Sequence, residues 1–339
     1  MRVAPCSRRF WSADLADLLE QLVHGLTLGS LYAMVATGLA LMFGVVRLVN
    51  FAHGEFYMLG GYAFWFAYRE LGAPYPVAGL AAAAAMGAFG LAYERVVIRA
   101  ILARTWHVQL IATLATSITL TNLAILVFGT QPKEVPTRLS STIVDVGGIR
   151  LAWQRLVVLA AAIAIFAGLE WFVTRTKLGK AMRAMSQNRE ACAVVGVDVQ
   201  RVALATFGIS AALAGAAAAL VSPLFNIFPD VGALLTLKAF AAVIVGGFGD
   251  VKGAIAAAFL IGLAESLAAG YVSYAYKDAI AFVVMVAVLL VRPQGLFGRR
   301  IGICRCGPGA GPSSPPRSSR SPGSSPSSRP ASSATCSTC

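Results

Sequence analysis

The chain has 339 residues, of which 58% are hydrophobic and only 13% charged, with a formal net charge of +13 at pH 7. A soluble domain carries roughly 25% charged residues, so this composition excludes an ordinary water-facing surface. We predict an all-α polytopic membrane protein whose apolar excess faces the lipid bilayer. Because the basic residues lie between apolar runs, the positive charge does not indicate a nucleic-acid partner.

Successive apolar stretches predict about eight or nine transmembrane helices. They cover residues 22–46, 56–68, 76–93, 108–128, 155–173, 202–224, 232–245, 254–269 and 278–291. The stretches 56–68 and 232–245 are too short to span a bilayer, so we expect these helices to be broken or re-entrant. The domain plan is an N-terminal segment (1–21), a transmembrane domain (22–300) and a Ser/Pro/Arg-rich tail (301–339). The tail lacks the apolar residues of a core and is predicted to be disordered.

The first break contains Asn50, His53 and Glu55. A carboxylate at membrane depth is a candidate functional group, and Glu55 is the strongest one. Glu170 and Glu265 are weaker candidates because each lies near the end of a span. For Asn50 and His53 we favour a capping role at the start of the broken helix.

Two further stretches are polar for membrane segments. GGFGDVKG (246–253) follows the second short stretch and predicts a glycine-rich turn rather than a nucleotide site. The span 108–128 is rich in Ser, Thr and Asn. Those side chains either face protein or a polar path, or bond back to carbonyls of their own helix.

Residues 172–202 form a basic island between two spans. Its basic residues are Arg175, Lys177, Lys180, Arg183, Arg189 and Arg201. Apolar residues at helical spacing between 176 and 189 predict a short amphipathic helix. The side of the membrane that holds the island carries 14 Lys and Arg residues, against 7 on the other side, or 10 if the N-terminus lies there. Because basic residues gather on the cytoplasmic side, this excess places the island in the cytoplasm. From pattern alone it is either an ordinary loop or a docking element for a soluble partner.

No residue pattern indicates catalysis. His24, His53 and His107 lack metal-ligand spacing, and the sequence contains no phosphate-binding loop. The six cysteines indicate neither a disulfide framework nor a zinc site. We therefore expect no catalytic residue, metal site or cofactor in this chain.

Several segments together resemble the permeases of branched-chain amino-acid ABC transporters of the LivH type. They are residues 25–62, with the hexapeptide NFAHGE at 50–55, then 175–215, 237–266 and the closing YKDAIAFVVMVAVLLVRPQGLFGR. The resemblance covers about residues 20–299. The family normally ends just after GLFGR, so a frameshifted or readthrough terminus is the simplest account of the tail.

This resemblance implies a subunit of a binding-protein-dependent importer in the bacterial inner membrane. Its implied partners are a sister permease, two cytoplasmic ATPases that bind the ATP, and a periplasmic or extracellular amino-acid binding protein. The island, about 174–201, looks like the family's ATPase-docking loop. The implied docking residues are Lys177, Gly179, Arg183, Glu190, Ala191 and Gly196, with Cys192 where the second alanine usually stands.

The implied translocation path passes the helix breaks at Asn50, His53, Glu55, Gly246 and Gly247. The implied cargo is leucine, isoleucine and valine. Two alternatives stay open: the same fold importing urea or short amides, and an ion-coupled secondary amino-acid transporter that would use Glu55.

Overall fold

The structure is a computed structural model, and it describes residues 7–297 except 138–139, 141, 147–148 and 272. The expectations for the tail 301–339 lie outside the described residues. The first half contains α1 (Ser7–Val46), α2 (His53–Trp65) with the π-helical turn η1 (Phe66–Glu70), α3 (Tyr75–Tyr93) running through η2 (Glu94–Ile98) into α4 (Arg99–Ile101), and α5 (Trp106–Phe128). The antiparallel strands β1 (Ile143–Val146) and β2 (Ile149–Ala152) follow.

The second half contains α7 (Trp153–Arg175), α8 (Lys177–Gln187), α9 (Arg189–Val194), α10 (Val199–Val221), α11 (Val231–Gly246), α12 (Val251–Tyr271), η3 (Tyr274–Tyr276) and α13 (Lys277–Val291). Within the described residues, seven helical segments are long and apolar enough to cross a membrane. The short helices α2 and α11 have 13 and 16 residues. Each of the nine predicted stretches thus has a helix, and the two predicted short ones are short.

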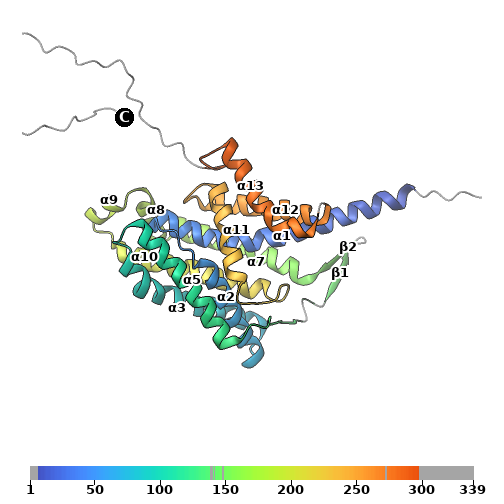
Figure 1. The fold of residues 1–339 in the computed structure, drawn as a ribbon, viewed down its shortest axis with the longest axis horizontal. Helices are drawn as coiled ribbons and strands as arrows, with labels where there is room; N and C mark the ends of the chain where they lie inside the picture. Colours follow the sequence, from blue (N-terminus) through green and yellow to red (C-terminus); the bar gives the residue numbers. More distant parts are fainter. Residues whose placement is uncertain (1–6, 138–139, 141, 147–148, 272, 298–339) are drawn as a thin grey trace, which may run out of the picture. The chain divides into compact units, whose positions relative to one another are not determined.

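Helix α1 forms the centre of the bundle, and almost all of its membrane-crossing part is buried (Figure 1). It packs along α12, α10 and α11, and α10 in turn packs along α3. Small residues allow close contact between α1 and α12, because a methyl group added to Gly25 would lie 3.0 Å from the Cα of Leu263. In contrast, α5, α7 and α13 expose most of their apolar surface, to lipid or to a partner.

The chain reverses direction after α1 at Arg47, whose φ of 58° is left-handed. It then re-enters the bundle, so that α2 begins against the side of α1 rather than at its end. The His53 Nε2 lies 3.1 Å from the carbonyl oxygen of Val35, eleven residues before the end of that helix. Helix α2 is short because it begins inside the bundle rather than at its edge.

The short helices α2 and α11 meet at their N-terminal turns. A methyl group on Gly54 would overlap the carbonyl oxygen of Gly232 and the hydroxyl of Thr236. The Gly54 N–H donates to that hydroxyl at 2.9 Å, and the hydroxyl donates to the Gly232 carbonyl at 2.9 Å. The first turns of two short helices that lie far apart in the sequence therefore meet in space, whereas the predicted break at Gly246 and Gly247 lies at the other end of α11.

Candidate functional site

The basic island folds as two short helices, each begun by a side-chain cap. The Thr176 hydroxyl accepts from the Gly179 N–H at 3.0 Å at the start of α8, and Asn188 Oδ1 accepts from the Ala191 N–H at 3.0 Å at the start of α9. Asp198 caps α10 in the same way. The predicted amphipathic helix is confirmed as α8. We call residues 174–201 the docking loop, after the role that the resemblance implies for them.

One face of the docking loop is anchored in the bundle. Met182 and Met185 of α8 and Cys192 of α9 are buried. Gly179 is buried as well, since a methyl group there would overlap the backbone of α7 at Phe172 and Val173. Thus Gly179 allows α8 to fold closely back onto the end of α7.

The other face is open. The side chains of Lys177, Arg183, Glu190 and Ala191 are exposed, and Gly196 is an exposed turn residue with φ of 87°. Beside them Val194 and Val195 are 88% and 81% exposed. These adjacent valines were not among the predicted site residues. The signal that could have found them is their place directly before Gly196, where the chain turns.

The loop lies at the same end of the bundle as two other predicted cytoplasmic groups. Arg47 at the end of α1 donates to the Gln187 carbonyl at 3.5 Å. Lys252 at the start of α12 forms an ion pair with Glu170 of α7 at 2.9 Å. Glu170, a weaker functional candidate, is therefore an exposed side chain that links α7 to α12.

The predicted turn at 246–253 connects α11 to α12. Gly247 and Gly249 have φ of 107° and 81°, and Asp250 Oδ1 accepts from the Lys252 N–H at 3.0 Å as α12 begins. Gly246 is buried against Gly253, where a methyl group would overlap backbone atoms. The glycine-rich turn is confirmed.

Asn50 and His53 contact groups inside the protomer. The N-cap of α2 is Ala52, and it makes no side-chain capping bond, so the expected capping role was wrong. Instead Asn50 Oδ1 accepts from the Ala52 N–H at 3.2 Å and stabilises the turn before the helix. The ring of His53 bonds to α1, since α2 begins beside that helix and places the ring next to the Val35 carbonyl.

Glu55 lies where α2, α5 and α11 meet, with none of its surface exposed. Ser117 of α5 donates to its Oε1 at 3.0 Å, and its Oε2 has no partner among the described residues. Its carboxylate also occupies the space beside Gly232 of α11. Most other polar side chains of α5 bond back to carbonyls of their own helix, which was one of the two alternatives predicted for this span. They are Thr113, Thr116, Thr119, Thr121 and Asn122.

A second buried polar cluster joins four helices. Lys238 Nζ of α11 lies 2.6 Å from Glu265 Oε1 of α12, 2.7 Å from Asp278 Oδ1 of α13, and 3.0 Å from the Tyr32 hydroxyl of α1. The Tyr32 hydroxyl donates to Glu265 Oε2 at 2.9 Å. Of these four residues the sequence marked only Glu265 as a functional candidate, and the structure gives it an ion-pair partner.

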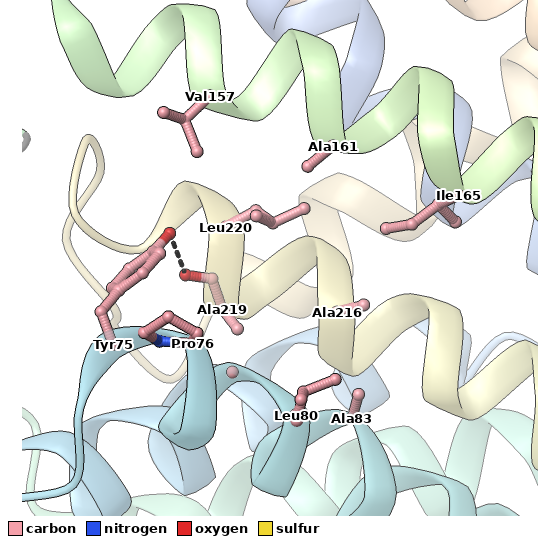
Figure 2. Close-up of a pocket in the computed structure, with 11 residues that line it drawn as sticks. Tyr75, Pro76, Leu80, Ala83, Val157, Ala161, Ile165, Ala216, Ala219 and Leu220 are labelled. Atoms are coloured by element: carbon pink, nitrogen blue, oxygen red, sulfur yellow. Dashed lines mark hydrogen bonds between the residues drawn. The ribbon is translucent and has the colours of Figure 1, made fainter.

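A cavity of about 500 Å³ lies between α3, α7 and α10 (Figure 2). Leu80, Val157, Ile165 and Leu220 are among the apolar side chains around it, and the Tyr75 hydroxyl donates to the Ala219 carbonyl at one end. None of the predicted site residues lines this cavity. Its apolar wall suits lipid chains rather than a polar solute.

Comparison with known proteins agrees with the sequence and the geometry. A model of the family described as "Branched-chain amino acid transport system / permease component" matches residues 21–289. The chain is 35% identical to the high-affinity branched-chain amino acid transport system permease protein BraD of Pseudomonas aeruginosa, over 84% of this chain and 97% of BraD. It is 31% identical to LivH of Escherichia coli, over 85% and 98% of the two chains.

The similarity extends more weakly to a second kind of permease. LivM of Escherichia coli is 27% identical over 80% of this chain and 68% of LivM. No solved structure matches the chain. On the family match and the similarity to BraD and LivH, this chain belongs to the permease family of branched-chain amino-acid transport systems.

Proposed function

We propose that the chain is a permease subunit of an ATP-driven, binding-protein-dependent importer of leucine, isoleucine and valine. It would reside in the bacterial inner membrane and form the translocation path with a sister permease. The names of BraD and LivH support the cargo, and the weaker likeness to LivM supports a sister subunit of related fold. An amino-acid binding protein outside the membrane would deliver the substrate.

The exposed face of the docking loop is the observation that carries this proposal. Two adjacent valines, Val194 and Val195, are almost fully exposed in a loop that is otherwise rich in charge. Contact with a partner would remove this apolar surface from water, which is favourable by about 25 cal/mol per Å². Glu190, Ala191 and Gly196 lie on the same short segment. This loop would therefore fit into a groove on a cytoplasmic ATPase, with Lys177 and Arg183 at its edge.

The buried face would carry the motion inward. Helices α8 and α9 connect α7 to α10, and the buried Met182 and Met185 hold α8 against the bundle. A displacement of the loop by the ATPases would therefore move α7 and α10 as rigid bodies. The Glu170–Lys252 ion pair extends the connection to α12. The chain itself would bind no ATP and perform no covalent chemistry.

The translocation path would pass the helix breaks, at Asn50, His53 and Glu55 on one side and Gly246 and Gly247 on the other. Broken helices at membrane depth place backbone ends and polar side chains where a polar solute can meet them. Asn50, His53 and Glu55 are buried within this protomer. Movement of the surrounding helices would be needed to expose them.

Docking can be tested with the double variant Val194→Asp/Val195→Asp, co-expressed with the two ATPase subunits and the sister permease. Both positions are exposed, so the membrane domain should fold and pair normally. We expect the ATPases to be lost from the purified complex while the sister permease is retained. Ser186→Asp, at another exposed position of the same loop, is the matched control. Retention of the ATPases by the double variant at the wild-type ratio would refute the assignment of this face.

A further inference from the structure

Helix α5 turns polar side chains away from the bundle in the middle of a membrane span. It packs mainly on α2, and Leu120 and Ala124 are buried on its inner side. The opposite side of the helix is exposed. Thr119 and Asn122 lie there, three residues apart and therefore on one face.

The other spanning helices with a large exposed surface have purely apolar outward faces. The exposed residues of α3 are Ala, Leu, Val and Pro. Those of α7 between residues 154 and 169 are Ala, Ile and Gly, and those of α13 between 279 and 291 are Ala, Phe, Val and Leu. Such faces suit contact with lipid chains. The outward face of α5 is of a different kind.

Both polar residues of this face lie within the hydrocarbon layer. Helix α5 has 23 residues and is about 34 Å long, slightly more than the bilayer core of about 30 Å. Asn122 and Thr119 lie six and nine residues before its last residue, Phe128. Lipid chains offer no hydrogen bonds at that depth, so a polar group there needs a partner in protein.

The two side chains differ in how far their own helix satisfies them. The Thr119 hydroxyl donates to the Ala115 carbonyl at 2.8 Å. An asparagine amide has two N–H donors and a carbonyl acceptor. One N–H of Asn122 donates to the Ile118 carbonyl at 2.7 Å, its single hydrogen bond among the described residues. Direct contact of the remaining groups with hydrocarbon would be strongly disfavoured.

The shape of this face suits a second helix. Exposed Ala115 and Thr119 are small at its centre, which allows close approach of another backbone. Ile111 and Leu126, on the same face toward its two ends, are 64% and 83% exposed. Small residues flanked by large apolar ones, with an amide that can bond across, are typical of contacts between helices in a membrane.

We infer that this face of α5, formed by residues 111, 115, 119, 122 and 126, is the surface that binds a spanning helix of the sister permease. The Asn122 amide would bond to a polar group of that helix, and the outward faces of α7 and α13 would contact lipid. This inference rests on the proposed pairing with a sister permease. The weaker likeness to LivM supports a partner of related fold.

Photo-crosslinking in membranes that contain the full complex tests this surface. A benzoylphenylalanine residue replaces Thr119 or Asn122 and, as matched controls, the exposed Ile163 of α7 or Val286 of α13. We expect illumination to join this chain to the sister permease from both α5 positions and from neither control. The inference is overturned if the α5 positions give no adduct with the sister permease, if they give a dimer of this chain instead, or if the controls react equally well.

The variant Asn122→Leu separates a protein contact from a lipid contact. Leucine suits lipid better than asparagine does, so a lipid-facing position would leave pairing unchanged, and that result would overturn the inference. We expect the sister permease to be retained roughly three- to tenfold less well in detergent, the effect of losing one hydrogen bond between helices. Ala164→Leu, on the exposed face of α7, is the matched control and should leave retention unchanged.

ATP-dependent leucine uptake by the wild-type complex distinguishes the two possible failures. A complex that contains the sister permease and takes up leucine, yet gives no adduct from α5, would overturn this surface and uphold the proposed function. A wild-type complex that retains no sister permease would overturn both.

Discussion

Lys238 should be one of the most sensitive positions for stability in the membrane domain. Its ammonium group has three partners on three other helices, at 2.6, 2.7 and 3.0 Å. The variant Lys238→Met keeps an unbranched side chain, shorter by one atom, and removes its charge. Glu265 would then be a buried carboxylate whose remaining partner is the Tyr32 hydroxyl.

The size of the effect follows from how exposed each partner is. The Glu265 side chain is 3% exposed, and breaking a buried ion pair by removing one member costs about 3–5 kcal/mol. The Asp278 side chain is 50% exposed, so the loss of its ion pair with Lys238 should cost only what a surface pair contributes, about 0–1 kcal/mol. We therefore expect Lys238→Met to lose about 3–5 kcal/mol, almost all of it through Glu265.

Thermal unfolding of the purified complex in detergent can measure this loss. With about 2–4 °C per kcal/mol for a large domain, Lys238→Met should lower Tm by roughly 6–20 °C. Asp278→Asn should lower it by only a few degrees. The double variant Lys238→Met/Glu265→Leu removes the unpaired charge and should recover much of the loss. The reasoning is refuted if Lys238→Met unfolds at the wild-type temperature, or if the double variant is no more stable than the single one.

Three further outcomes follow from the structure. Gly54→Ala should destabilise the complex by about 1–3 kcal/mol, the usual cost of overpacking, because its methyl group would overlap the Gly232 carbonyl. The control is Gly168→Ala, at an open position of α7. Equal Tm values for the two variants would contradict the account. Thr176→Ala removes the cap of α8 and should cost about 1 kcal/mol. Hydrogen exchange across α8 should therefore be about fivefold faster. Thr174→Ala removes no cap and should leave the exchange rate unchanged. Truncation after residue 301 should leave complex assembly and leucine uptake at wild-type levels, and loss of either would give the tail a function.

Much of the helical framework can be predicted from the sequence because it depends on local pattern. Uninterrupted apolar stretches mark the spanning helices, and Leu178, Met182 and Met185 at helical spacing mark α8. The two short stretches correctly predict two short helices. These features need no knowledge of which helices are neighbours.

The parts that sequence reasoning missed depend on tertiary neighbours. Lys238 and Tyr32 are 206 residues apart in the chain, so no local pattern could reveal their contact. The polar residues of α5 look alike in sequence, yet the Ser117 hydroxyl donates to Glu55 because α2 packs beside that turn. The capping role expected for Asn50 and His53 failed because α2 begins beside α1, which offers His53 the Val35 carbonyl instead.

The central claim is tested most directly by uptake of labelled leucine into proteoliposomes. These would contain this chain with its co-purifying partners, with or without ATP inside and binding protein outside, and with unlabelled urea as a competitor. The account predicts leucine uptake that requires both ATP and binding protein and that excess urea does not inhibit. Inhibition by urea would move the cargo to the amide class. Uptake by this chain alone, driven by an ion gradient, would contradict the account and reduce the docking loop to an ordinary cytoplasmic connection.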